Sequence, residues 1–376
     1  YELCLWLLKR SRRFRIMSDL KINNITNRVG DTGPTIAGVS TVATSAFMVM
    51  PSGDTAIRGA GSGRGVIAGG FSYPTQINTI QKLEIATTGN TTDFGDLART
   101  AYSAAGFASK TRGIYAGGRA ENSPLPDIST QIQYITISSN GGSYDFGDIS
   151  YQGGTGIRGS SNNTRGLIFG GIYPASPEGI NQNNIDFITI ATAGDSTSFG
   201  SLTTYVYASG VASSSTRAVI AGGQRSTGQP TSPLTIQNLI EFVTFAGGGN
   251  AQDFGDLAVA VRGNSGASSS TRAVFAGGYN ASPIGHDQGS DTMEYVTMAS
   301  TGNAQDFGDL GATSYATSVS NSIRGVFGAG PNSPSHTNVL EFVTISTTGN
   351  ASDFGDMSTK VIFSSQNIAD AHGGLE

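Results

Sequence analysis

The chain has 376 residues, and its 27 acidic against 22 basic residues give a formal net charge of −5. This balance gives no support to nucleic-acid binding, which usually requires a basic face, and the single cysteine, Cys4, excludes an intrachain disulfide or a zinc site made of several cysteines. The 53 glycines and the low charged fraction of 13% are typical of short strands joined by tight turns and predict an all-β fold.

The first residues do not match a secretory signal. In residues 1–16 the apolar run precedes the basic run, and the apolar run is too short to span a bilayer. We expect residues 1–16 to be read-through or a non-native leader, because Met17 opens a polar segment that reads as a natural start. The alternative is a basic tail at residues 9–15 that contacts a membrane surface or nucleic acid. We predict no membrane insertion.

Residues 17–50 carry no copy of the motif that dominates the rest of the chain. Two short stretches, residues 34–40 and 45–50, look like strands bounded by glycine and proline. We interpret residues 17–50 as a leader or attachment segment, through which copies of the chain could associate as a homo-oligomer.

From residue 51 onward the chain repeats one unit six times. Each unit contains an eight-residue signature such as TRAVFAGG at residues 271–278, and the period of about fifty residues indicates a repeat protein with one core. The predicted units are residues 51–97, 98–149, 150–202, 203–257, 258–310 and 311–357.

Every unit contains four candidate strands. They are a small-residue strand, the signature with its final glycine pair, an apolar run, and a strand with the tetrapeptide DFGD or a variant of it. Repeated four-stranded antiparallel sheets predict a β-propeller, in which each sheet packs on its neighbours around an axis. The glycine pairs predict positive φ or close backbone approach.

The last residues raise the question of how the ring closes. Residues 358–366 look like the first strand of a further unit, and we expect residues 367–376 to form a tail. The closing strand could pair with strands from residues 35–50 and give a composite seventh blade, or the ring could close at six. We predict six units with a shared seam, and a truncated gene is the third alternative.

The strand order and the glycine pair resemble the kelch repeat, in which a Tyr lies in the third strand and a Trp in the fourth. The kelch Tyr is matched by Tyr134, Phe187, Phe242, Tyr295 and Phe342, whereas the place of the Trp is taken by Phe94, Phe146, Phe199, Phe254, Phe307 and Phe354. The resemblance therefore implies the fold, a kelch-like β-propeller, more strongly than it implies any function.

The amino-acid sequence of the units also resembles that of kelch-like structural proteins of tailed bacteriophages, notably marine cyanophages. It covers nearly all of residues 17–357 and includes the repeated sequence TGN and DFGD. This resemblance implies a virion protein at the tail or fibre, whose partners are other tail or baseplate proteins and a host-surface glycan or protein.

Two repeated residues are interpreted as structural. The DFGD copies invite comparison with the magnesium-binding motif of kinases, but that motif occurs once and needs a catalytic loop around it. We expect each DFGD phenylalanine to fill the space between blades. We expect the signature arginines to bond DFGD carboxylates, although they could instead form a cationic ring for an anionic glycan. These arginines are Arg64, Arg112, Arg165, Arg217, Arg272 and Arg324.

The segments between the glycine pair and the third strand diverge completely. They occupy the same position in every unit, so we expect them on one face of the propeller, as in many binding surfaces. The alternative is that they are merely tolerant surface loops. Candidate ligand-binding residues in them are Tyr73, Arg119, Tyr173, Glu178, Arg225, Tyr279 and His286.

We find no set of residues that predicts catalysis, a metal site or a cofactor. The three histidines, His286, His336 and His372, lack ligand-like spacing, and no unit departs from the repeat as a catalytic unit would. We therefore predict a non-enzymatic recognition module of a phage virion. The alternatives are an extracellular or cell-surface kelch-like adhesion protein of bacteria and a carbohydrate-active kelch-type enzyme. The galactose-oxidase type of enzyme needs a Cys–Tyr cross-link that Cys4 alone does not suggest.

Overall fold

The computed structural model describes residues 63–72, 75–120, 127–151, 154–173, 180–226, 235–280, 288–311, 317–332, 335–359, 361 and 368–375. All of them belong to one unit of the chain, residues 58–376. The predictions for residues 1–16 and 17–50 lie outside the described residues.

The described chain is all-β apart from one short 3-10 helix, and it contains six four-stranded antiparallel sheets. The first sheet contains β1 (Arg64–Ser72), β2 (Thr75–Glu84), β3 (Thr92–Asp96) and β34 (Ile368–Ala369). The second contains β4 (Ala105–Ala108), β5 (Arg112–Ala116), β8 (Gln131–Thr136) and β9 (Tyr144–Asp148). The third contains β10 (Arg158–Ser161), β11 (Arg165–Phe169), β14 (Asn184–Thr189) and β15 (Thr197–Ser201).

The other three sheets follow the same plan. The fourth contains β17 (Gly210–Ser213), β18 (Arg217–Ala221), β21 (Leu239–Thr244) and β22 (Gln252–Asp256). The fifth contains β24 (Ser265–Ser268), β25 (Arg272–Ala276), β28 (Thr292–Thr297) and β29 (Gln305–Asp309). The sixth contains β30 (Thr317–Ser320), β31 (Arg324–Asn332), β32 (Ser335–Thr344) and β33 (Ser352–Asp356).

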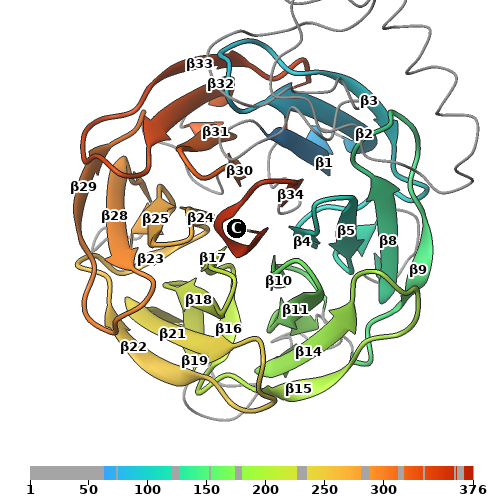
Figure 1. The fold of residues 1–376 in the computed structure, drawn as a ribbon, viewed down its shortest axis with the longest axis horizontal. Helices are drawn as coiled ribbons and strands as arrows, with labels where there is room; N and C mark the ends of the chain where they lie inside the picture. Colours follow the sequence, from blue (N-terminus) through green and yellow to red (C-terminus); the bar gives the residue numbers. More distant parts are fainter. Residues whose placement is uncertain are drawn as a thin grey trace, which may run out of the picture. The chain divides into compact units, whose positions relative to one another are not determined.

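The first sheet takes its innermost strand from the other end of the chain. β34 pairs with β1 through Gly65↔Ala369 and Val66↔Ile368, and lies near the centre of Figure 1 beside the C-terminus. Residues 368–375, which we expected to form a tail, are instead this strand and the 3-10 helix η2 (Gly373–Leu375). The reason is burial, because Ile368 and Ala369 lie in the core. Most of the closing strand expected at residues 358–366 lies outside the described residues.

The variable segments also contain short strands that the sequence did not predict. Four hairpins follow the glycine pairs: β6 (Arg119–Ala120) with β7 (Asp127–Ile128), β12 (Ile172–Tyr173) with β13 (Ile180–Asn181), β19 (Gln224–Ser226) with β20 (Thr235–Ile236), and β26 (Tyr279–Asn280) with β27 (Gln288–Gly289). β16 (Tyr205–Tyr207) adds to the third hairpin and β23 (Val261–Arg262) to the fourth. In the first and sixth sheets the second and third strands are themselves longer.

The sheets are arranged radially in Figure 1, with the strands of small residues innermost and the DFGD strands outermost. Each hydrophobic cluster combines residues of two neighbouring sheets: Phe254 packs with Phe275 and Met298 of the following sheet. The cluster around Phe354 includes Ile67 and Ile85 of the first sheet. This architecture of several four-stranded antiparallel sheets is consistent with a β-propeller-like fold.

Candidate ligand-binding face

The signature arginines join neighbouring sheets, but not through carboxylates. The guanidinium Nη1 of Arg112 donates to the carbonyl oxygens of Ile190 and Ala191 in the next sheet at 3.1 and 2.8 Å. The corresponding acceptors for Arg64, Arg165, Arg217, Arg272 and Arg324 are carbonyl oxygens of Ile137, Phe245, Met298 with Ala299, Ile345, and Ile85 with Ala86. Our expectation of DFGD carboxylates as partners is therefore corrected: the third strand of the next sheet ends in main-chain acceptors that a planar guanidinium can reach.

The same guanidinium groups stack on the aromatic residues of their own third strands. The guanidinium carbon lies 4.1 Å from the ring centroid of Tyr295 for Arg272, and 4.5 Å from that of Phe342 for Arg324. Arg64 differs because Lys82 stands at the aromatic position, and it pairs instead with Glu84 at 3.2 Å. These stacked and bonded guanidinium groups do not form a free cationic ring, so the glycan-ring alternative loses its basis.

The DFGD phenylalanines and glycines form a second repeated contact. All six phenylalanines are buried, and five of them meet the ring of the third strand edge to face or at a similar angle. The carbonyl oxygen of Phe254 accepts a hydrogen bond from the N–H of Gly302, in the turn between the third and fourth strands of the next sheet, at 2.7 Å. A Cβ on Gly255 would lie 2.5 Å from the Gly302 carbonyl oxygen, so the glycine is required for this close approach.

Sequence reasoning missed a polar position inside the apolar third strand. Its members are Gln81, Gln133, Asp186, Glu241, Glu294 and Glu341, and all but the half-buried Glu341 are buried. Glu294 accepts a hydrogen bond from the main-chain N–H of Ala258 at 2.7 Å, and Glu341 one from Gly311 at 2.9 Å. A polar residue that recurs in the middle of an apolar run is the signal that could have revealed this set.

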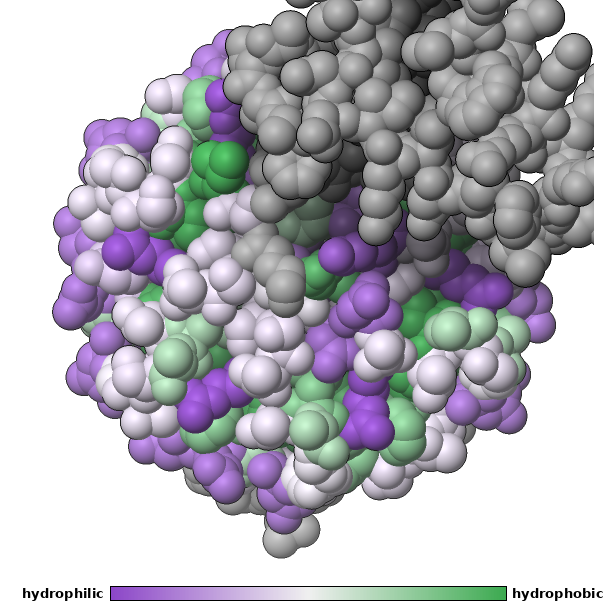
Figure 2. All heavy atoms as spheres, viewed as in Figure 1, coloured by the Kyte–Doolittle hydropathy of each residue, from purple (hydrophilic) through white to green (hydrophobic). Residues whose placement is uncertain are grey.

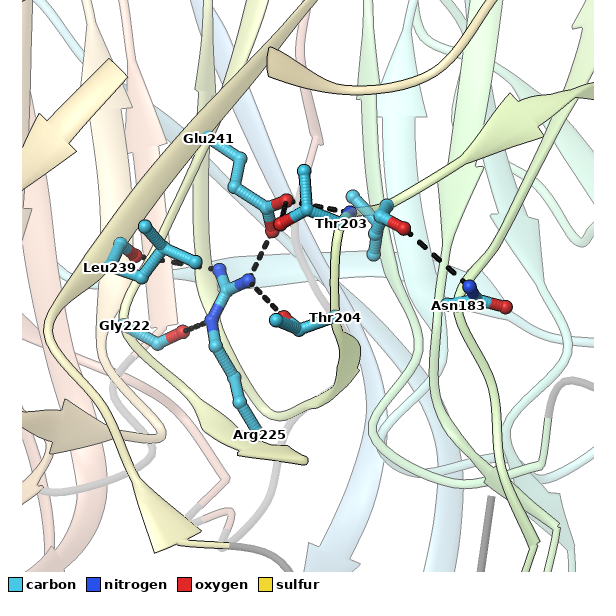
Figure 3. A network of polar contacts seen from close by, with 8 residues as sticks. Asn183, Thr203, Thr204, Gly222, Arg225, Leu239 and Glu241 are labelled. Carbon is cyan, nitrogen blue, oxygen red and sulfur yellow. Dashed lines mark hydrogen bonds and ion pairs between the residues drawn. The ribbon is translucent and has the colours of Figure 1, made fainter. Parts of the chain in front are cut away.

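Arg225 is the clearest correction among the candidate ligand-binding residues. Its side chain is 2% exposed and forms an ion pair with Glu241, which is fully buried. Nε donates to the Gly222 carbonyl oxygen at 2.8 Å, and Nη1 also donates to Thr204 Oγ1 at 2.9 Å (Figure 3). Arg225 therefore anchors its hairpin to the scaffold and cannot contact a ligand, because a buried charge needs a partner and Glu241 supplies it.

The other described candidates remain near the surface. Arg119 is exposed, while Tyr173 and Tyr279 are half-buried. The guanidinium of Arg262 lies 5.6 Å from the ring centroid of Tyr279, and Phe71 and Tyr102 form a ring pair with centroids 6.0 Å apart. Tyr73, Glu178 and His286 lie outside the described residues. Half-buried aromatic rings thus lie in or beside the hairpin segments.

The position of the hairpins follows from strand direction. Because consecutive strands are antiparallel, the hairpin between the second and third strands lies at the opposite end of a sheet from the turn that ends in TGN. On the part of the face that is coloured in Figure 2, hydrophilic residues are frequent along the outer edge, and residues of intermediate hydropathy, small hydrophobic areas and some hydrophilic residues lie nearer the middle. The variable segments can therefore share a face without sharing contacts with the turns.

His372 lies beside β34 and the innermost strands of the sheets. His372 Nε2 lies 3.3 Å from both Ser161 Oγ and the Ala108 carbonyl oxygen, and the N–H of Gly374 donates to Nδ1 at 3.1 Å. Desolvation lowers the pKa of His372 to about 4, and the hydrogen bond to Ala108 opposes the shift. The histidine is a structural part of the C-terminal segment.

The described residues contain no group of three or more His, Cys, Asp or Glu side chains placed to hold a metal ion. Within the same ranges, no helix has the length and hydrophobicity that a transmembrane segment needs.

No protein-family model matches the chain, and a search of curated proteins finds no match.

Proposed function

We propose that the six sheets close into a six-bladed β-propeller in which β34 completes the first blade. The contacts that join neighbouring sheets also join the sixth sheet to the first. Arg324 donates to the Ala86 carbonyl oxygen at 2.9 Å, and the N–H of Gly89 donates to the Phe354 carbonyl oxygen at 2.7 Å. A closed ring leaves no unpaired sheet face, which favours this arrangement over an open one.

We further propose that this propeller is a non-enzymatic structural and recognition module of a phage virion, which binds a glycan or protein on the host surface. The observation that supports it is the contrast between constant inter-sheet contacts and hairpin segments that differ in every unit. A rigid scaffold with divergent segments at one position is how recognition surfaces are commonly built. Weak contacts from several hairpins, on several copies in one particle, would add to a useful avidity.

Hairpin exchange tests the recognition role. In the test variant, residues 121–126, 174–179, 227–234 and 281–287 are replaced by Gly/Ser stretches of equal length, and Arg225 is kept because it anchors its hairpin. The control variant carries Thr88→Ala, Thr301→Ala and Thr348→Ala, three exposed turn residues at the opposite end of the sheets. The fluorescently labelled proteins are compared on cyanobacterial cells and on a glycan array.

The hairpin variant should lose binding while it retains the melting temperature, and the control should retain both. If the hairpin variant folds and binds as the unchanged protein does, the recognition role is wrong. Binding that is lost in both variants would also contradict it, because the turn residues lie away from the hairpins.

A further inference from the structure

Residues 368–375 form the least extensively paired of the innermost strands, together with the turn that follows it. β34 pairs with β1 at two positions, whereas the innermost strands of the other five sheets each pair at four. After β34 the chain turns through η2, where the N–H of Leu375 donates to the His372 carbonyl oxygen at 2.9 Å. The side-chain contacts of the segment therefore matter more for its position than those of a longer strand would.

His372 connects this segment to the second and third sheets. Its Nε2 lies 3.3 Å from the Ala108 carbonyl oxygen of β4 and 3.3 Å from Ser161 Oγ of β10. On the other side of the imidazole, Nδ1 accepts a hydrogen bond from the N–H of Gly374 at 3.1 Å. A ring nitrogen can accept only when it carries no proton, so these contacts require a neutral imidazole with its proton on Nε2.

A second proton on the imidazole is incompatible with the contacts on the Nδ1 side. Protonated Nδ1 is a donor, so it and the N–H of Gly374 would face each other as two donors. The main chain of η2 has no room to move aside. A Cβ on Gly374 would lie 2.0 Å from the Ser161 carbonyl oxygen, and one on Gly373 would lie 2.2 Å from that of Ser269. Protonation therefore opposes the position of the whole segment.

No charged group contributes to the pKa of His372 among the described residues. Desolvation lowers this pKa to about 4, and the hydrogen bond to Ala108 opposes the shift. Asp370 of the same segment accepts a hydrogen bond from the main-chain N–H of Arg64 at 2.8 Å. The charged and titratable side chains of the strands packed against the segment donate to main-chain carbonyl oxygens: Arg64 to Ile137, Arg112 to Ile190, Tyr115 to Val66 and Arg158 to Ser209.

We propose that residues 368–375 are a pH-dependent clasp, which stays seated while His372 is neutral and leaves the innermost strands when His372 takes up a proton. The released imidazolium is hydrated, whereas in the seated clasp its charge is buried without a counter-charge. The two strand pairs of β34 and the burial of Ile368, Ala369 and Leu375 oppose the release. Release uncovers the edge of β1. The clasp does not depend on the recognition role proposed above.

Hydrogen–deuterium exchange of the full chain at pH 7 and at pH 4.5 tests the clasp, after correction for the pH dependence of intrinsic exchange. The reporters are the N–H groups of Asp370 and Leu375, which donate to the carbonyl oxygens of Arg64 and His372. Their opening constant should rise about 60-fold from pH 7 to pH 4.5, as follows from a pKa of about 4 in the seated clasp and 6.5 in the released one.

The N–H groups of β18 in the fourth sheet are the reference for opening of the whole fold. The clasp should open at least about tenfold more often than β18 at both pH values, because it leaves without the other strands. Equal opening constants for the clasp and β18 would mean that the segment leaves only when the whole protein unfolds, and would overturn the proposal. An opening constant of the clasp that does not change with pH would overturn it as well.

His372→Gln, which keeps a side-chain N–H donor but takes up no proton, should remove the pH effect. His336→Gln is the matched control, since it removes a histidine of β32 in the sixth sheet, and it should keep the effect. A pH effect that persists in His372→Gln would contradict the proposal.

Gly374→Ala keeps the test valid if His372→Gln does not fold. Because its Cβ would overlap with the Ser161 carbonyl oxygen, the clasp should already be open at pH 7 while β18 stays protected. A Gly374→Ala protein whose clasp is as protected as before would show that the segment can shift within its site, and would overturn the proposal.

Discussion

Substitution of Gly355 by alanine tests whether the sixth sheet contacts the first in solution. Gly355 has φ of +142°, and a Cβ on it would lie 2.6 Å from both the carbonyl carbon and the carbonyl oxygen of Gly89. Gly89 has φ of +156°, and its own Cβ would meet nothing within 4 Å. An alanine would therefore have an unfavourable φ at either position, but only at Gly355 would its Cβ also overlap with a neighbouring main chain.

The structure gives the expected sizes of the two effects. Alanine at positive φ costs about 1–2 kcal/mol at either position. The overlap with the Gly89 main chain, which cannot rotate away as a side chain could, adds about 1–3 kcal/mol at Gly355. Gly355→Ala should thus lower the free energy of unfolding by about 2–5 kcal/mol, and Gly89→Ala by about 1–2 kcal/mol.

Urea unfolding followed by circular dichroism measures both changes, with Gly308→Ala as the internal reference. A Cβ on Gly308 would lie 2.5 Å from the Gly349 carbonyl, a contact between two sheets that are adjacent in sequence. If Gly308→Ala is costly but Gly355→Ala matches Gly89→Ala, the first and sixth sheets are apart in solution and the closed ring is wrong.

Three further predictions concern His372, Arg225 and Arg272. Because the pKa of His372 in the folded state is lowered to about 4 from 6.5, the unfolded chain binds a proton first as pH falls, and stability should decrease between pH 6.5 and pH 4. The loss is at most about 3 kcal/mol because each pKa unit corresponds to about 1.4 kcal/mol, and urea titrations at several pH values should show a flatter profile for His372→Gln. Arg225→Met should cost about 3–5 kcal/mol in denaturant unfolding by leaving Glu241 unpaired, and the double variant Arg225→Met, Glu241→Leu should be less destabilised than Arg225→Met. Arg272→Lys should cost about 1 kcal/mol, and a double-mutant cycle with Tyr295→Leu should give a coupling of about 0.5–1 kcal/mol; no coupling would mean that the stacking is incidental.

The four strands of the repeating unit could be predicted because the same pattern of residues occurs six times in the sequence. The glycine pairs were expected at positive φ, and Gly277 and Gly278 have φ of +67° and +100°. In the fourth sheet the strands from β17 to β22 lie within residues 203–257, whereas the first sheet takes its innermost strand, β34, from residues 368–369. These features depend on local patterns, which sequence reasoning reads well.

The features that the sequence did not predict depend on long-range contacts. We expected a shared seam with a closing strand at residues 358–366, but not the pairing of β34 with β1, because nothing in the two residues Ile368 and Ala369 indicates a partner about 300 residues earlier in the chain. Arg225 lies in a polar, divergent segment that looks like a surface loop, and only Glu241 in the third strand explains its burial. The acceptors of the signature arginines could not be predicted from the sequence, because every residue has a main-chain carbonyl oxygen whatever its type.

Main-chain acceptors also explain how the scaffold stays constant while residues around it vary. The arginines bond the carbonyl oxygens of Ile137, Ile190, Phe245, Met298, Ile345 and Ile85, so that any apolar residue of suitable size can stand there. The glycines of the turns and of DFGD likewise meet through main-chain atoms. Both contacts involve the ends of the third strands and the turns that follow them, whereas the divergent hairpins join the other ends. Changes in a hairpin therefore leave the contacts between sheets intact, and the hairpin of Arg225 is bonded through Glu241 to the core of its own sheet.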